Sequence, residues 1–222
     1  ALRERDQRTV TIAPEAGTER MRRVVAKDLT EEEILGAAEV LARGGITTLR
    51  LYFLVGLPGE REEDIRGIVD LVKKVRHQMV KVLKGERKRG RITVSVNPFV
   101  PKASTPFQWH PYQEVRGLQG KVRFLQKALQ GIEGCKVVVG LPKWGYLQAL
   151  LSLGDRRVGE MIYRLWQQGG NWFQGMKTLP FNPDFWVYRR KEKGEIFPFD
   201  IIDHGCSKEA LWEEYERALK GG

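Results

Sequence analysis

The sequence has 222 residues, enough for one hydrophobic core or for a core with an appendage. No apolar run approaches the ~20 residues that a membrane-spanning helix needs, and the charged amino-terminal stretch ALRERDQRT is unlike a signal peptide, so we expect no membrane partner. The 38 Lys and Arg residues outnumber the 28 Asp and Glu residues, and the resulting formal charge of +10 is not evenly spread along the chain.

Strands and helices alternate over the first half of the chain. Hydrophobic periodicity predicts strands at 9–13, 47–55 and 91–96, and helices at 18–25, 30–43 and 62–81. Thr30 begins its helix with a capping box that Glu33 completes, and Pro14 is expected to end the first strand. Right-handed crossovers would make such strands parallel neighbours with the helices outside them.

Three strands are too few to close a barrel, so this part is predicted to be half of one. The sequence therefore predicts an α/β fold, a partial (βα) barrel over residues 1–110, followed by an α+β extension over residues 111–222. In the extension we expect helices at 115–130, 144–153, 157–168 and 207–219, a strand at 136–139, and an aromatic-rich tail between residues 169 and 203.

The segment from Leu49 to Glu60, LRLYFLVGLPGE, predicts a buried strand that is followed by a glycine-rich turn. Its strand residues are apolar or aromatic except for Arg50, and Leu57-Pro58-Gly59 breaks the strand before an acidic first helical turn. Glycines there let the backbone approach a ligand, and parallel α/β folds place their sites at the carboxyl ends of strands.

Nine basic residues lie between positions 73 and 91, opposed by one acid, Glu86. They are Lys73, Lys74, Arg76, Lys81, Lys84, Arg87, Lys88, Arg89 and Arg91. Such a patch attracts RNA, DNA or an acidic protein, but it has no interleaved aromatic residues for base stacking. A solvated helix end and loop is the alternative interpretation, and we favour it.

The chain has only two cysteines, Cys135 and Cys206. Their scarcity indicates a reducing compartment, so a cytoplasmic location is expected. Two distant thiols cannot supply the three or four ligands of a self-contained zinc or iron–sulfur site, and the three histidines are not paired at metal spacing. We therefore predict no metal site within this chain.

Three segments in order carry a resemblance to a known family: TIAPEAGTERMRRVVAKDLT (11–30), LYFLVGLPGEREEDI (51–65) and VNPFVPKASTPFQW (96–109). They resemble the fourth, fifth and sixth barrel strands of the radical S-adenosylmethionine (SAM) superfamily. The tail motifs GDRRVGEMIYRLWQQGG and DHGCSKEALWEEYERALKG are similar to the carboxy-terminal region of uncharacterised B12-binding members. The resemblance thus covers nearly the whole chain.

The three closely spaced cysteines that hold the family's [4Fe–4S] cluster have no counterpart here. The resemblance implies that the cluster loop, the first three strands and any cobalamin domain lie upstream, in the missing amino-terminal half of the same protein. It implies a parent enzyme that cleaves SAM to a 5′-deoxyadenosyl radical, which then abstracts hydrogen from an unknown substrate. Methyl transfer through cobalamin could follow. The fragment would supply half of the SAM site and a substrate cap, and would be inactive alone.

The resemblance also implies cofactor-binding roles for six residues. Glu15 would accept hydrogen bonds from the SAM ribose hydroxyls, and Lys27 would pair with the SAM carboxylate; their alternatives are a helix-terminal acid and an exposed lysine. Leu54 and Gly56 match the strand segment against adenine, and would otherwise be strand core and a turn glycine. Asn97 and Phe99 match the segment whose backbone holds adenine, although Asn97-Pro98 is also a strand stop. No catalytic residue is assigned.

A second hypothesis is a non-catalytic binding module that uses the basic segment 73–91 to hold RNA or an acidic partner. In either case an isolated half barrel leaves its sheet edges open, so we expect the fragment to dimerise or to be poorly soluble.

Overall fold

The computed structural model describes residues 8–83 and 90–221. The chain forms two compact units, and each contains segments that are distant in sequence. The sheet unit comprises Ala1–Pro98, Arg116–Pro142 and Arg217–Gly222, and the tail unit comprises Phe99–Val115 and Lys143–Glu216.

The sheet unit is built on four parallel strands in the order β1-β2-β3-β4, the same as their order in the chain. The strands are β1 (Thr9–Glu15), β2 (Thr48–Val55), β3 (Arg91–Pro98) and β4 (Cys135–Val139). The helices between them are α1 (Glu19–Val24), α2 (Glu31–Arg43), α3 (Glu62–Val82) and α4 (Val115–Gln130). The predicted α/β class with parallel strands is confirmed.

Local signals begin the helices as the sequence predicts. Thr30 Oγ1 accepts the backbone N–H of Glu33 at 3.2 Å, and the Glu33 carboxylate accepts the Thr30 N–H at 2.8 Å, so the capping box forms. At the start of α3, the Asp64 carboxylate accepts the Arg61 N–H at 2.8 Å. These side chains satisfy backbone donors that a helix leaves without partners in its first turn.

Strand β1 is longer than the sequence predicts, because it continues through Pro14 to Glu15. Its pairing with β2 shifts between Ile12 and Glu15, which marks a β-bulge or a similar irregularity. Proline has no N–H to donate to the ladder and is tolerated at such places. The irregularity leaves Glu15 at the carboxyl end of the strand.

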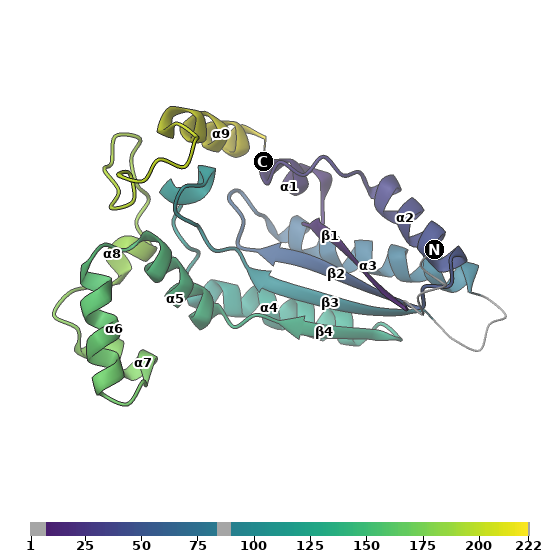
Figure 1. The fold of residues 1–222 in the computed structure, drawn as a ribbon. Coiled ribbons are helices and arrows are strands. Elements are labelled where there is room, and N and C mark those ends of the chain that lie inside the picture. The colour runs from purple at the N-terminus through teal and green to yellow at the C-terminus, as the bar shows by residue number, and fades with distance from the viewer. Residues whose placement is uncertain (1–7, 84–89, 222) are drawn as a thin grey trace. The chain divides into compact units, whose positions relative to one another are not determined.

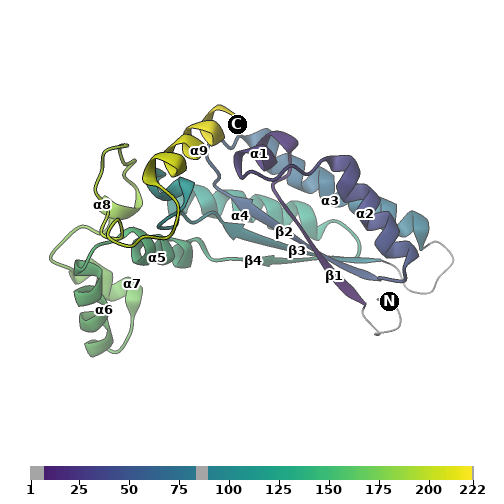
Figure 2. The same ribbon diagram turned by 45° about the horizontal axis from the view of Figure 1, so that its top comes forward.

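The helices of the sheet unit cover one face of the sheet. Figures 1 and 2 show α2, α3 and α4 on the same side of the strands. On that side Leu49, Leu51 and Phe53 of β2 are no more than 1% exposed, as are Ile92 and Val94 of β3. The core of this unit therefore lies between the sheet and the helices.

The structure places the predicted helix 115–130, apart from Val115, and the strand 136–139 in the sheet unit, although the sequence assigned both to the extension. The reason is β4, which pairs with β3 from Ile92↔Cys135 to Val96↔Val139. With that strand in the sheet, the regular elements in the described part of the tail unit are all helical, whereas the sequence predicts an α+β extension over residues 111–222.

The tail unit is built from short helices and an aromatic cluster. Its elements are η2 (Pro106–Trp109), most of α5 (Pro142–Leu153), α6 (Arg157–Gln167), α7 (Trp172–Gly175), η3 (Met176–Thr178), α8 (Asp184–Val187) and most of α9 (Lys208–Lys220). Trp109, Tyr112 and Tyr215 are among the largest fully buried side chains. Across residues 8–83 and 90–221, none of the helices is long and apolar enough to cross a lipid bilayer.

Candidate functional site

The carboxyl ends of the parallel strands meet at one edge of the sheet, which is where α/β proteins place their ligands. Glu15 ends β1, Gly56 follows β2, Asn97 precedes the last residue of β3, and Gly140 follows β4. A Cβ atom added to Gly140 would lie only 2.7 Å from Asn97 Oδ1, so the ends of β3 and β4 approach closely. Four chain segments therefore converge at this edge.

Glu15 has an unusual backbone conformation for a residue with a side chain. Its φ is +67°, in the left-handed region that non-glycine residues rarely occupy. Such conformations carry a cost and gather at functional sites, so the observation supports a role for this residue beyond packing. The Lys27 ammonium lies 3.5 Å from Glu15 Oε1, with side-chain exposures of 39% and 27%. A partly exposed pair of this kind contributes little stability and leaves both groups accessible to a ligand.

Arg22 fixes the loop that carries this pair. Its side chain is only 1% exposed and donates to the Leu29 carbonyl at 2.5 Å and to the Ala16 carbonyl at 3.2 Å. Burial lowers the pKa of Arg22 below its ordinary value, although the Glu19 carboxylate acts in the opposite direction. The buried Arg22 guanidinium thus fixes the backbone at Ala16, next to Glu15, and at Leu29, two residues after Lys27.

The turn after β2 is stabilised by the buried side chain of Glu60. Gly56 has a φ of +87°, and its N–H donates to Glu60 Oε2 at 2.8 Å. The same oxygen accepts the Lys121 ammonium at 2.5 Å, and the Glu60 side chain is 3% exposed. Burial raises the pKa of Glu60 above its ordinary value, although Lys121 acts in the opposite direction. Glu60 therefore ties the turn to α4 and does not face a ligand.

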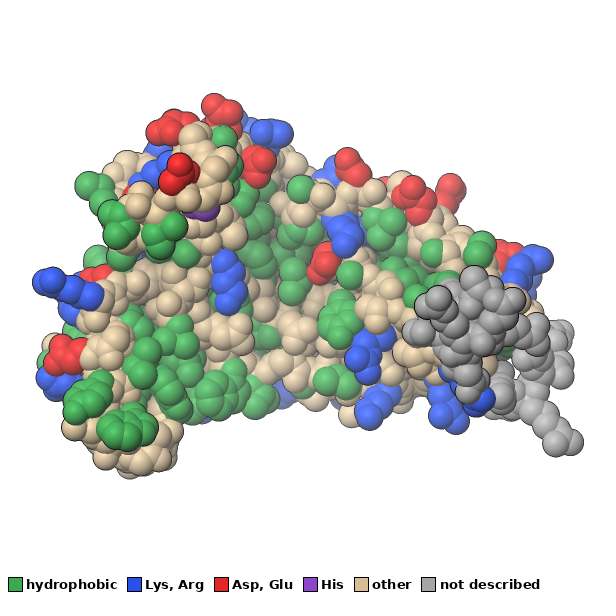
Figure 3. All heavy atoms as spheres, viewed as in Figure 1, with side chains coloured by type: hydrophobic (Ala, Val, Ile, Leu, Met, Phe, Trp, Pro, Cys, Tyr) green, Lys and Arg blue, Asp and Glu red, His purple; other side chains and the backbone are tan. Residues whose placement is uncertain are grey.

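The face of the sheet opposite the helices carries polar side chains in register. One row across the four strands consists of Thr11, Arg50, Thr93 and Lys136. Nearer the carboxyl edge, Tyr52 lies beside Ser95 and Leu54 lies beside Asn97, whose Nδ2 donates to Ser95 Oγ at 3.4 Å. Figure 3 views this side and shows hydrophobic and basic side chains intermixed over the strands.

Five of the six predicted cofactor-binding residues belong to this edge. Glu15 and Lys27 form an ion pair, and Leu54 and Asn97 are neighbours in register on the uncovered face. Gly56 lies directly after Leu54's strand. The exception is Phe99, which belongs to the tail unit and packs edge-on against Phe107 with ring centroids 5.1 Å apart.

Sequence reasoning missed the residues that position the site. Arg22 lies in a helix with the basic residues Arg20 and Arg23, and nothing in the local sequence marks its burial. Lys121 is 61 residues from its partner Glu60, so no spacing rule connects the two. Ser95 was the most accessible to prediction, since it stands two residues before Asn97 on the same strand face.

The basic segment 73–91 is only partly described, because Lys84, Arg87, Lys88 and Arg89 lie outside the described residues. Arg76 is buried and donates to the Glu133 carbonyl at 2.9 Å, so it is not part of a solvated surface. Lys73 and Lys74 form ion pairs with Asp70 at 3.5 Å and with Glu31 at 2.6 Å. These contacts do not favour nucleic-acid binding by this helix.

Potential metal ligands do not gather in the part of the chain that the structure describes. No group of three or more His, Cys, Asp or Glu residues there could hold a metal ion. Cys135 is half-buried in the sheet unit, and burial raises the pKa of its thiol to about 11, whereas Cys206 is exposed in the tail unit.

Comparison with known proteins gives a relative of unknown function. The chain is 34% identical over 155 residues to an uncharacterised protein of the archaeon Methanocaldococcus jannaschii. The match covers 70% of this chain and 32% of the relative, so the chain spans about a third of the length of the curated protein it matches. No family model and no solved structure matches the chain.

Proposed function

We propose that this chain forms the carboxy-terminal half of the SAM-binding barrel of a radical SAM enzyme. The observation that carries the proposal is a one-sided parallel sheet in sequential strand order with a strained carboxylate, Glu15, at the end of its first strand. Right-handed crossovers in sequential order put every helix on one face, as in a barrel. A doubly wound sheet reverses its order and is covered on both faces.

The sheet face without helices supports the proposal that this sheet is part of a barrel with further strands. Parallel sheets are normally covered on both faces, because helices or a closed barrel interior bury them. Within the described residues of the sheet unit, β1 pairs only with β2 and β4 only with β3. The relative extends well beyond the matched region, which leaves length for additional strands and for a cluster-binding loop.

The carboxyl edge offers groups that suit SAM. Glu15 can accept two hydroxyl hydrogen bonds from a ribose, and the Lys27 ammonium can pair with a carboxylate as a point charge. Leu54 presents an apolar side chain on the uncovered face, where a purine ring could pack, and Gly56 and Asn97 offer backbone groups beside it. In this proposal, Arg22 and Glu60 act indirectly by fixing the two loops.

With a reduced [4Fe–4S] cluster, bound SAM would supply the radical chemistry of the reaction. The cluster ligands, and a cobalamin domain if the parent has one, would come from the preceding part of the protein. The residues of this chain would bind and orient the nucleoside and help to exclude water from it.

The test is anaerobic iron–sulfur reconstitution of the parent protein, followed by measurement of 5′-deoxyadenosine formed from SAM. Glu15→Gln removes the charged acceptor of the ribose hydroxyls. It should raise the KM for SAM by about tenfold or more, since hydrogen bonds to charged groups contribute ~1.5–3 kcal/mol. Iron content should not change.

The matched control is Glu32→Gln, an exposed glutamate in the first turn of α2. It should leave the KM unchanged. A parent protein that binds no cluster and forms no product, or a Glu15 variant that behaves like the Glu32 variant, would contradict the proposal.

A further inference from the structure

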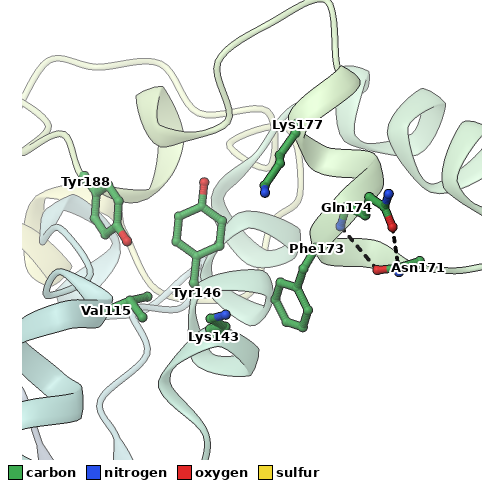
Figure 4. Close-up of a pocket in the computed structure, with 8 residues that line it drawn as sticks. All are labelled: Val115, Lys143, Tyr146, Asn171, Phe173, Gln174, Lys177 and Tyr188. Carbon is green, nitrogen blue, oxygen red and sulfur yellow. Dashed lines mark hydrogen bonds between the residues drawn. The ribbon is translucent and has the colours of Figure 1, made fainter.

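The tail unit contains a cavity of about 570 Å³, within the range of small-molecule sites. It lies among the start of α5, the segment from α7 to η3, and the residue that follows α8. It is lined by Val115, Lys143, Tyr146, Asn171, Phe173, Gln174, Lys177 and Tyr188 (Figure 4). None of these residues takes part in the carboxyl edge of the sheet.

The charged groups of this cavity are of one sign. Lys143 and Lys177 line it, and its lining includes no Asp or Glu among the described residues. In the same part of the chain, neither ammonium forms an ion pair, although Lys143 lies 5.7 Å above the Phe173 ring. Two ammonium groups without carboxylate partners in a concave site favour an anion.

The aromatic groups favour a flat ligand. Tyr146 and Tyr188 have ring centroids 5.3 Å apart, and Phe173 presents a third ring. Figure 4 shows the Lys177 ammonium and the Tyr146 hydroxyl directed into the same space. Aromatic side chains stack on planar groups with a gain beyond simple area burial.

The tyrosine hydroxyls remain neutral at physiological pH. Burial, together with a 2.6 Å hydrogen bond to Asp184, raises the pKa of Tyr146 far above its ordinary value. Burial also raises the pKa of Tyr188. The Asp184 carboxylate accepts this hydrogen bond but does not line the cavity, so the charged side chains of the lining are the two lysines. The Asn171 and Gln174 amides also line the cavity, and Asn171 Nδ2 donates to Gln174 Oε1 at 3.1 Å.

We infer that this cavity binds a small anionic molecule with a flat unsaturated ring, such as an aromatic or heteroaromatic carboxylate. The ammonium groups would hold the anion and the rings would pack against its planar part. The inference is independent of the proposed radical chemistry, because it concerns equilibrium binding in the tail unit and needs no cluster and no SAM.

The test is a calorimetric titration of the intact protein that carries this chain with 2-naphthoate, at low salt and in 0.5 M NaCl. Saturable binding that weakens with salt is expected, since screening reduces attraction between charges. The uncharged 2-naphthalenemethanol and the non-planar cyclohexanecarboxylate should each bind at least tenfold more weakly. Each lacks one of the two recognised features.

Two variants and one control locate the site. Lys177→Gln should weaken 2-naphthoate binding about tenfold, and Phe173→Leu should reduce the preference for the planar acid. Lys193→Gln, which changes an exposed lysine of the same unit outside the cavity lining, should leave both unchanged. Far-UV circular dichroism of the variants checks that each remains folded.

The inference would be overturned by an absence of saturable binding at millimolar 2-naphthoate. It would also be overturned if the neutral alcohol bound as tightly as the acid, or if Lys177→Gln and Lys193→Gln had equal effects. None of these outcomes bears on 5′-deoxyadenosine formation, so the two proposals fail separately.

Discussion

Glu60 and Lys121 form an ion pair whose carboxylate is almost fully withdrawn from water. Burial raises the pKa of Glu60 above its ordinary value of 4.5, even with the Lys121 ammonium at 2.5 Å. The protonated carboxyl group stabilises the folded state when its pKa is higher there than in the unfolded state. This stabilisation is fully present below the ordinary pKa of 4.5 and is lost as the pH rises through the folded-state pKa. The pair therefore predicts a decline in stability that begins just above pH 4.5.

Removing the lysine tests this directly. Lys121→Met leaves a buried carboxylate without its counter-ion and should destabilise the sheet unit by about 3 kcal/mol at pH 7. The loss should be smaller at pH 5, where Glu60 is more readily protonated. Urea denaturation at the two pH values measures both quantities.

The control for that variant is Lys127→Met, an exposed lysine of the same helix, which should change stability by less than ~0.5 kcal/mol. The double variant Glu60→Gln with Lys121→Met should recover part of the loss. Equal losses at pH 5 and pH 7 for Lys121→Met would show that the carboxylate charge is not the cause.

At the scale of elements, the loop after β1 packs backbone to backbone on α3. A Cβ atom at Gly17 would lie 2.2 Å from Ile68 N and 2.5 Å from the Gly67 carbonyl carbon, which real side chains do not tolerate. Thr18 Oγ1 donates to Asp64 Oδ1 at 2.6 Å, and Arg20 pairs with the same carboxylate. The position of the Glu15–Lys27 loop therefore depends on a glycine contact with a helix that begins 45 residues later.

Gly17→Ala should destabilise the protein by about 3 kcal/mol, because the clash is with backbone that cannot move aside. Gly120→Ala in α4 is its matched control, since a Cβ there meets nothing within 4 Å. That change should stabilise the protein by ~0.5–1 kcal/mol through helix propensity. Thermal unfolding of the two variants should shift in opposite directions, and a neutral Gly17→Ala would refute the close packing.

At the scale of the whole molecule, the sheet unit exposes strand β4 and a face that its helices do not cover. Val138 on β4 is 46% exposed and stands in register with Ser95 on that face. Unpaired strand edges promote association. We therefore expect the 222-residue chain, produced alone, to associate in a concentration-dependent way.

Val138→Lys should shift the chain towards monomer in sedimentation velocity, because a charge on an edge strand opposes pairing. Val40→Lys, at a 69% exposed position on α2, changes the charge equally and should leave association unchanged. A monomer at all concentrations, or identical behaviour of the two variants, would contradict this prediction.

Local patterns in the sequence determined most of the helices and strands. The capping box at Thr30, the acidic first turn of α3 and the alternation of strands with helices depend on residues within a few positions of one another. Such signals predict element type and, through right-handed crossovers, a parallel α/β sheet. They also placed Glu15, Gly56 and Asn97 at strand ends, which suffices to gather them at one edge.

Only the tertiary structure decided which residues distant in sequence are in contact. The membership of β4 in the sheet, the burial of Arg22 and the Glu60–Lys121 pair all join residues that no local period connects. The same holds for Phe99, which hydrophobicity could not separate from the carboxyl edge, and for the cavity around Tyr146. The physical reason is that a contact between distant residues depends on how packed elements meet, whereas capping and periodicity depend only on the local chain.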